Sequence, residues 1–403
     1  MPTFRKETHL MICVGIDTAS DKHDVCIMNK EGEIFKRIFT IHNNKTEYKK
    51  LFNEIESAKK FWNDSKVCIG IESTGVYSET LVNYLSKIEA YEIIYINPIL
   101  TNMFQHSEII HYAKTDKIDA KGICIFLSDK RKRLYTYTPP SYTILEMRSL
   151  GREINHLNKQ INKTVNRLTG MLHVVFPEFF QVFDKVKGST CLEYLRLFPT
   201  PDMIVRKHSL NDVYKKLDGR GRKIENLNKL IHFAKETIGH STKSDAIAIS
   251  FLASQLQLSY SQKEALIDRM DILVTENAMN LAQIPGIGAI TACTIMGEIG
   301  DISNFRGADS LVAYAGINPM VYQSGKYEAK GLSMSKKGSS YLRNAIILVS
   351  RLIIQYDEKF KTYYEKKRAE GKSYNVAIGH VSNKLTRVIY HILKYNEPYD
   401  ETK

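Results

Sequence analysis

Two short apolar runs of this chain each end in a carboxylate, and this repeated pattern most constrains how the chain can fold. Val14-Gly15-Ile16 leads into Asp17, and Ile69-Gly70-Ile71 leads into Glu72. Runs of this kind are typical of buried strands, whose last residue emerges at the rim of a sheet. The pattern therefore predicts a sheet with acidic side chains along one edge.

A second acidic pair, Asp116 and Asp119, opens a predicted helix that continues to Ser128. Residues three apart share one face of a helix, so both carboxylates can point at one ion. Taken alone, such a pair is typical of a solvated helix face, and a strand ending in Asp is typical of a turn or a helix cap.

Together, four carboxylates are candidates for one metal site: Asp17, Glu72, Asp116 and Asp119. Carboxylate oxygens are the ligands that Mg²⁺ prefers, and two such ions can hold the attacking and leaving oxygens of a phosphodiester. The four positions therefore predict metal-dependent phosphoryl transfer.

The order of the predicted elements gives the fold class of the first part of the chain. Strands are expected over 11–17, 24–28 and 34–40, followed by a helix over 45–62, a strand over 66–71, a helix over 78–88 and a strand over 91–96. Three strands in hairpin order and then alternating helices and strands are typical of ribonuclease H. We therefore predict an α/β domain over residues 1–130.

The rest of the chain is expected to be helical. Residues 131–280 are predicted to form a linker and a helical coiled-coil region, with one long helix from Ile144 and another over 261–282. The first helix has a heptad-like apolar seam whose members are spaced by threes and fours. They are Leu150, Ile154, Leu157, Ile161, Val165, Leu168 and Leu172. The seam can pack within the chain or pair two protomers.

Residues 281–403 are predicted to form a helical C-terminal domain that begins with a helix-hairpin-helix. Ile284-Pro-Gly-Ile-Gly288 precedes an apolar helix, and its glycines, Gly286 and Gly288, let backbone approach a phosphate at the N-terminus of that helix. The alternative is a glycine turn between core helices.

Further along, serines lie among cations in two segments, Tyr322–Lys326 and Ser333–Arg343. A hydroxyl can act as a nucleophile, and cations stabilise a pentavalent phosphorus transition state. The candidate phosphate-contacting cations are Lys326, Lys336, Lys337 and Arg343. From chemistry alone, each of these serines is more typical of a turn or a helix cap than of a nucleophile.

Charge and composition indicate the class of partner. The 403 residues include 57 Lys and Arg against 44 Asp and Glu, a net charge of +13 that favours a polyanionic partner. No apolar run is long enough to cross a bilayer, and the N-terminus lacks a signal peptide, so we expect a cytoplasmic protein with no membrane partner. The six scattered cysteines are expected to be buried thiols.

The ordered set of motifs resembles the DEDD-type insertion-sequence transposases, also called bridge-RNA-guided recombinases. The resemblance covers residues 11–128 and 281–350. It implies a RuvC-like N-terminal domain that binds Mg²⁺ through the four carboxylates, and a C-terminal transposase domain that supplies a nucleophilic serine. We place that serine at Ser324, with Ser333 and Ser335 as alternatives, and it would form a covalent phosphoserine link to DNA.

The same resemblance implies the partners. Donor and target DNA would be cut and rejoined, and a structured RNA encoded beside the gene would pair with both and set specificity. The protein would act as a homo-oligomer, a dimer or tetramer, whose protomers are joined by the coiled-coil arm.

Three other functions fit part of the pattern. A structure-selective, junction-resolvase-like DNA nuclease would use the same carboxylates with an activated water and need no serine. A sugar kinase or actin-like ATPase would need a second, glycine-rich phosphate loop, which the sequence lacks. A purely architectural nucleic-acid binder would leave the carboxylates without a metal.

Overall fold

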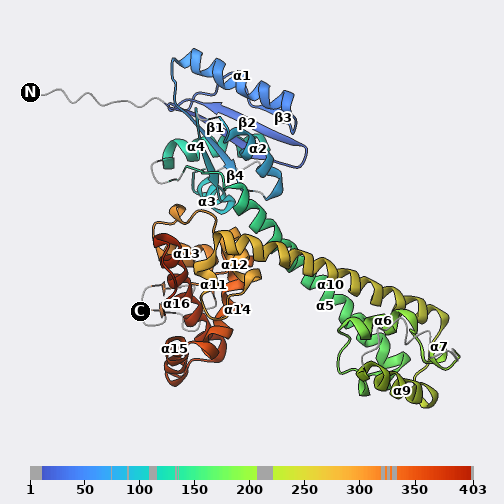
Figure 1. The fold of residues 1–403 in the computed structure, drawn as a ribbon. Helices are drawn as coiled ribbons and strands as arrows, with labels where there is room; N and C mark the ends of the chain where they lie inside the picture. The colour runs from blue at the N-terminus through green and yellow to red at the C-terminus, as the bar shows by residue number, and fades with distance from the viewer. Residues whose placement is uncertain are drawn as a thin grey trace, which may run out of the picture. The chain divides into compact units, whose positions relative to one another are not determined.

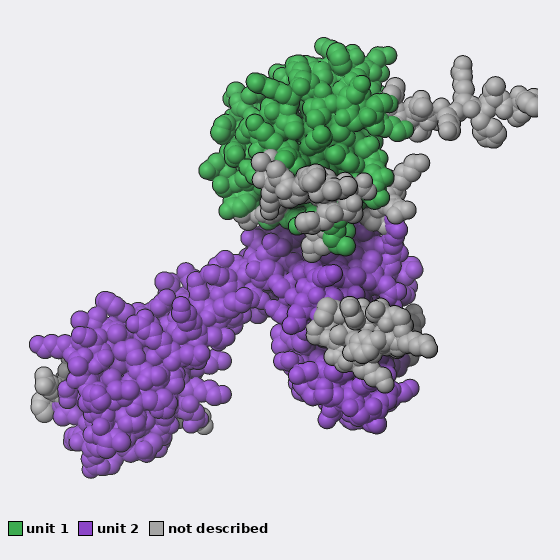
Figure 2. Space-filling model, turned by 180° about the vertical axis from the view of Figure 1, so that it is seen from behind, with its two compact units in different colours: residues 1–139 green, residues 140–403 purple. Residues whose placement is uncertain are grey.

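The computed structural model divides the chain into two compact units, residues 1–139 and 140–403, which Figure 2 colours separately. It describes residues 11–73, 75–88, 90–108, 116–131, 134, 136–206, 221–318, 323–324, 327–328 and 334–400. Within those residues, the first unit holds a mixed sheet, and the second is helical apart from a short hairpin (Figure 1). The predicted class, an α/β region joined to a helical one, is confirmed.

The sheet of the first unit has five strands in the order β3-β2-β1-β4-β5. The central strand β1 (Ile12–Thr18) pairs antiparallel with β2 (Lys22–Met28) and parallel with β4 (Val67–Glu72). On the outer sides, β3 (Phe39–His42) pairs antiparallel with β2, and β5 (Tyr91–Ile96) pairs parallel with β4. The carboxyl ends of β1, β4 and β5 therefore lie along the same edge.

The third strand begins later than the sequence predicts. It was expected from Ile34, but Ile34 forms only an isolated bridge with Met28, and continuous pairing begins at Phe39. Between them, Lys36 has a φ of 54°, in the left-handed region that extended strands do not use. The chain therefore turns before the strand can form.

One face of the sheet packs against two helices. Val14 and Ile16 of β1 are fully buried in a core that includes α1 (Lys45–Trp62) and α2 (Val76–Leu85). Because side chains alternate along a strand, the remaining residues of β1 point to the opposite face.

That opposite face packs against α4 (Asp116–Lys130), with α3 (Pro98–Glu108) beside it. Its core includes Cys13, Cys26 and Cys68 from three neighbouring strands. All six cysteines of the chain are buried thiols, as predicted.

In the second unit, two long helices pack along each other, α5 (Tyr142–Val175) and α10 (Lys243–Asn277) (Figure 1). The second begins well before the predicted Ser261. Its start is set by a capping box, in which Thr242 accepts from the Asp245 N–H while the Asp245 carboxylate accepts from the Thr242 N–H. The apolar seam of α5 packs within this chain; pairing of protomers remains a prediction.

Two apolar cores lie along this helix pair. One core lies where the C-terminal end of α5 meets the N-terminal half of α10. Short elements complete it: η2 (Pro177–Gln181), α6 (Ser189–Leu197), α7 (Pro201–Arg206) and α9 (Gly221–Glu236).

The other core joins the opposite ends of α5 and α10 to the C-terminal helices. Those elements are α11 (Met279–Ala282), α12 (Ala289–Ile299), η3 (Ile302–Asn304), α13 (Ala308–Ala315), α14 (Ser340–Tyr356), α15 (Glu358–Ala369) and α16 (Tyr374–Tyr395). Across the described parts of the chain, every helix is too short or too polar to span a bilayer.

Candidate functional site

Asp17 and Glu72 lie at the ends of two neighbouring parallel strands. Glu72 is the last residue of β4, and Asp17 is the last but one of β1. Alternation along the strands puts Asp17 on the same face as Cys13, and Glu72 on the same face as Cys68. Both carboxylates therefore point to the face that α4 covers.

Two glycines let α4 lie directly on those strands. A Cβ added to Gly15 would collide with the carbonyl oxygen of Ala120, and one added to Gly70 would lie 2.7 Å from Cδ1 of Leu127. Any larger residue at either position would push the helix away from the sheet. The glycines of the two strand motifs therefore fix the distance between α4 and the sheet.

This packing sets the position of the second acidic pair. Asp116 and Asp119 lie in the first turn of α4, where the helix dipole favours negative charge. Ala120, the residue after Asp119, packs on Gly15, and Asp17 is two residues further along the same strand. The start of α4 is therefore held against the end of β1.

The pKa of the Asp17 carboxyl reflects these surroundings. Its pKa is raised to about 7, first because burial disfavours the charged form and next because of the negative charge of Glu72. The charges of Asp119, Asp116 and Asp24 raise it further. The structure thus brings the other three predicted carboxylates, and Asp24 as well, into the surroundings of Asp17.

Glu72 and Asp116 each have a polar partner among the described residues. The buried hydroxyl of Thr101, on α3, donates a hydrogen bond to Oε1 of Glu72. The ammonium of Lys22 lies 3.3 Å from Oδ2 of Asp116, in a pair that is half exposed and therefore weak. The Thr101 contact is the one that can hold a carboxylate in a fixed orientation.

Asp24 was not singled out by sequence reasoning. It lies opposite Asp17 in the β1–β2 register, is 4% exposed, and accepts a hydrogen bond of 2.5 Å from Oγ1 of Thr40. The signal was available in the short turn between the two strands, which places Asp24 across from Asp17 once the hairpin is assumed.

The donor set fits a hard divalent cation, since every group is a carboxylate and their charges repel one another. A cation among them would remove that repulsion. In the part of the chain that is described, however, no three His, Cys, Asp or Glu side chains are already grouped to hold one ion. The individual ligands therefore remain predictions.

The predicted helix-hairpin-helix joins α11 to α12. Gly286 has a φ of 88°, and a Cβ there would lie 2.9 Å from Cβ of Leu352 on α14, so this glycine serves both the turn and the packing. Gly288 is exposed at the N-terminus of α12, and nothing lies within 4 Å of where its Cβ would be. Of the two glycines, Gly288 is the one open to a ligand.

The predicted nucleophile lies in the short hairpin. Ser324 belongs to β6 (Gln323–Ser324), which pairs antiparallel with β7 (Tyr327–Glu328). Lys326 and Ser333 lie outside the described residues.

The segment after this hairpin is fixed by backbone contacts. The Ser335 N–H donates to the carbonyl of Asn318 at 2.9 Å, and its hydroxyl donates to Oδ1 of the same residue at 2.8 Å. The Lys336 N–H donates to the carbonyl of Gly316, and the side chains of Lys336 and Lys337 are exposed. The predicted phosphate-contacting lysines thus stand on an anchored segment.

Whereas the side chains of Lys336 and Lys337 are exposed, that of Arg343 makes a hydrogen bond within the protein. Its guanidinium donates a 3.1 Å hydrogen bond to the carbonyl of Ala315 at the end of α13. This contact ties α14 to α13, so at least part of the donor capacity of Arg343 is structural.

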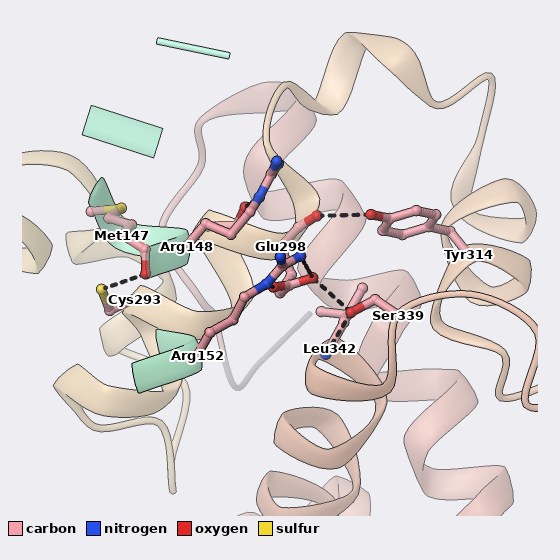
Figure 3. A network of polar contacts seen from close by, with 9 residues as sticks. Met147, Arg148, Arg152, Cys293, Glu298, Tyr314, Ser339 and Leu342 are labelled. Carbon is pink, nitrogen blue, oxygen red and sulfur yellow. Dashed lines mark hydrogen bonds and ion pairs between the residues drawn. The ribbon is translucent and has the colours of Figure 1, made fainter. Parts of the chain in front are cut away.

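A buried carboxylate supports this region (Figure 3). Glu298 on α12 is 2% exposed and accepts from Nε of Arg152 and from Oγ of Ser339, each at 2.7 Å. Ser339 also caps α14 by accepting from the Leu342 N–H, and the Tyr314 hydroxyl donates to the Glu298 carbonyl. One residue therefore connects α5, α12, α13 and α14.

Sequence reasoning missed Glu298. The available signal was a lone carboxylate in an otherwise apolar helix, since such a group requires partners when it is buried.

Comparison with known families matches both ends of the chain. A model of the DEDD transposase of IS110 elements, described as "Transposase", matches residues 14–177, and one described as "Transposase IS116/IS110/IS902 family" matches residues 278–365. Together they cover more than half of the sequence, including both regions described above. The chain belongs to the DEDD-type insertion-sequence transposases.

Individual relatives agree with this assignment. A pilin gene-inverting protein of Moraxella bovis is 22% identical over 96% of this chain and 97% of its own. The transposase for insertion sequence element IS1111A of Coxiella burnetii is 29% identical over 31% of this chain and 35% of its own. An uncharacterized 43.6 kDa protein of insertion element IS110 from Streptomyces coelicolor is 28% identical, and the match spans 38% of each chain. The protein is therefore a DNA transposase, an enzyme of DNA recombination.

Proposed function

We propose that this transposase cuts and rejoins donor and target DNA with a carboxylate metal site and a serine nucleophile. The observation that carries the proposal is the partial burial of Asp17 among other acidic groups: burial first, and then their negative charges, raise the pKa of its carboxyl to about 7. Crowding of this kind costs stability in the absence of a cation, and perturbed carboxylates cluster at functional sites.

The fold proposed for the first unit is the ribonuclease H or RuvC-like one. It is supported by the strand order β3-β2-β1-β4-β5, with an antiparallel hairpin side and a parallel side. The position of Asp17 and Glu72 at the carboxyl ends of adjacent strands also supports it.

The residues proposed to hold Mg²⁺ are Asp17, Glu72, Asp116 and Asp119. When bound, the ion would supply a Lewis acid that polarises the phosphodiester and stabilises charge on its oxygens. The buried Thr101 hydroxyl would keep Glu72 in one orientation, and the glycine contacts of α4 would hold Asp116 and Asp119 in place.

The proposed nucleophile is Ser324. Its Oγ would attack the phosphorus of one phosphodiester, forming a P–O bond to serine while the bond to the leaving DNA oxygen breaks and that oxygen takes a proton. A hydroxyl of the partner strand would then attack the phosphoserine, rejoin the DNA and return the proton to serine. Lys336 and Lys337, exposed on the anchored segment nearby in sequence, are proposed to contact phosphate.

Guidance by a structured bridge RNA and assembly into a homo-oligomer, a dimer or tetramer, are also proposed. The net charge of +13 supports a nucleic-acid partner, and the long α5–α10 pair offers an extended surface for a coiled-coil contact between protomers. We also propose that the helix-hairpin-helix contacts DNA at Gly288, because this glycine is exposed at the start of α12.

The test is a covalent-adduct assay. End-labelled donor and target DNA are incubated with protein, Mg²⁺ and RNA from the flanking locus, denatured and separated on a protein gel. We expect label that migrates with the protein and is lost in Ser324→Ala and in Asp116→Ala.

Other outcomes would change the proposal in defined ways. Label that survives in Ser324→Ala but disappears in Ser333→Ala or Ser335→Ala would move the nucleophile. Cleaved DNA that never carries protein would favour a metal-dependent nuclease that activates water.

A further inference from the structure

The last three helices of the chain carry a large share of its positive charge. Residues 340–395, which span α14, α15, α16 and the connections between them, contain eleven Lys and Arg against four Asp and Glu, a net charge of +7 out of the +13 of the whole protein. Helix α16 has no acidic residue. A surface with this excess attracts polyanions.

Most acidic groups of this stretch are already engaged. Glu358 pairs with Lys361 at 3.0 Å, and Glu370 pairs with Lys367 at 2.9 Å. Asp357 is 3% exposed and caps α15 by accepting from the Phe360 N–H. They therefore do little to offset the other cations.

Three of those cations line one hollowed surface. Lys359 and Lys366 on α15 and Lys384 on α16 line two adjoining hollows of about 410 Å³ each, which share Lys359 and Lys384. Among the described residues, none of these three ammonium groups forms an ion pair. Glu397 and Asp400 of the C-terminal segment line only the first hollow. The second hollow is lined by one carboxylate, Glu358, which is paired with Lys361, so the α15 side of the surface is the positive one.

The surface also holds one of its cations in place. The ammonium of Lys384 lies 4.9 Å from the centre of the Phe360 ring and 5.1 Å from that of Tyr363. Contacts with the faces of two rings orient an ammonium group without neutralising it. Lys384 is therefore positioned to meet an anion at little additional cost in side-chain entropy.

We propose that this surface, formed by Lys359, Lys366 and Lys384 between α15 and α16, binds the phosphate backbone of duplex DNA. Spaced, unpaired lysines contact phosphates without reading sequence, which suits a protein that acts on DNA. The surface also shares one apolar core with the helix-hairpin-helix, since α11 packs on α16. The inference rests on the assignment as a DNA transposase but requires neither Ser324 nor the carboxylates.

The experiment measures binding of a labelled 30-base-pair duplex of arbitrary sequence to the full chain over a range of salt concentrations. In K359Q/K366Q/K384Q we expect affinity to fall by about tenfold or more, and the slope of log affinity against log salt to decrease by about 2 to 3, one for each lost phosphate contact.

Two matched variants distinguish the effect of this surface on DNA binding from the effect of the protein's total charge. K45Q/K49Q/K60Q removes the same charge from exposed positions of α1 in the other unit, and we expect the slope of the parent protein. K359R/K366R/K384R keeps the charge and is expected to retain the parent slope. Circular dichroism of all three variants establishes that each is folded.

Equal slopes in K359Q/K366Q/K384Q and K45Q/K49Q/K60Q would overturn the proposal. So would a slope change seen only with a structured RNA of the same length, since that would assign the surface to RNA. The assay needs no strand cleavage, and Ser324→Ala is expected to bind duplex as the parent does, so failure of this proposal and failure of the serine mechanism give different results.

Discussion

Asp17 in the first unit and Glu298 in the second are carboxylates with opposite surroundings. In the first unit, Asp17 is surrounded by other acidic groups, and its pKa rises to about 7. In the second, Glu298 is still more buried, yet Arg152 and Ser339 supply a cation and a hydroxyl to it. A carboxylate without compensation marks a place for an external cation, whereas a compensated one holds the fold together.

The largest effect is expected from neutralising the uncompensated group. Asp17→Asn should lower strand cleavage by more than about 100-fold, because even groups that only orient metal ligands contribute about 10- to 100-fold. The variant should remain folded, because the substitution removes repulsion. Gel quantification of cleaved DNA checks the first expectation and thermal unfolding the second, with the exposed Asp21→Asn as control. Normal cleavage by Asp17→Asn would remove Asp17 from the site.

Metal binding should distinguish the two units directly. At a Mg²⁺ concentration of about 100 times the dissociation constant, the parent protein should gain about 2.7 kcal/mol in unfolding free energy. This gain should be absent in Asp17→Asn and unchanged in Glu298→Gln. Denaturant unfolding with and without Mg²⁺ measures it, and an equal gain in all three proteins would place the cation elsewhere.

Removing the compensated carboxylate should reduce stability. Glu298→Gln leaves Arg152 without its counter-charge and weakens the bond to Ser339, so the free energy of unfolding should fall by about 2 kcal/mol. Denaturant titration of the purified variant tests this. A fall no larger than that of an exposed pair would show that burial does not strengthen the network.

A smaller effect is expected from the partner of Glu72. Thr101→Val removes the hydroxyl that donates to Glu72 and should lower cleavage by about tenfold, with Thr101→Ser restoring it. Initial cleavage rates of the two variants provide the comparison. If valine and serine behaved alike, the hydroxyl would have no role in orienting Glu72.

The smallest effect is expected from an exposed pair of the same chemistry as Arg152–Glu298. Glu146 accepts from Nε and Nη2 of Arg269 at 2.7 and 2.9 Å, but on the surface of the α5–α10 pair. Glu146→Gln should change the unfolding free energy by about 0.5 kcal/mol or less, and high salt should abolish the difference. Unfolding at low and high salt tests both statements, and a loss as large as that of Glu298→Gln would remove the contrast between the pairs.

Much of the first unit followed from local pattern. Apolar runs with β-branched residues predicted the strands. The close contact of α4 at Gly15 and Gly70, which brings the acidic residues together, came only from the structure. The third strand was placed too early because the left-handed conformation of Lys36 has no clear signal in a non-glycine residue. In the second unit, the start of α10 was missed although Thr242 and Asp245 form a recognisable capping box.

The sequence by itself determined the fold class, the candidate carboxylates and the family, because these depend on periodicity and on short motifs. Only the tertiary structure decided which groups surround each charged residue. Glu298 meets Arg152 across 146 residues of chain. The lysines of α15 and α16 line one surface because the two helices pack together. Whether a charge is compensated depends on contacts between distant segments, and a linear pattern does not carry that information.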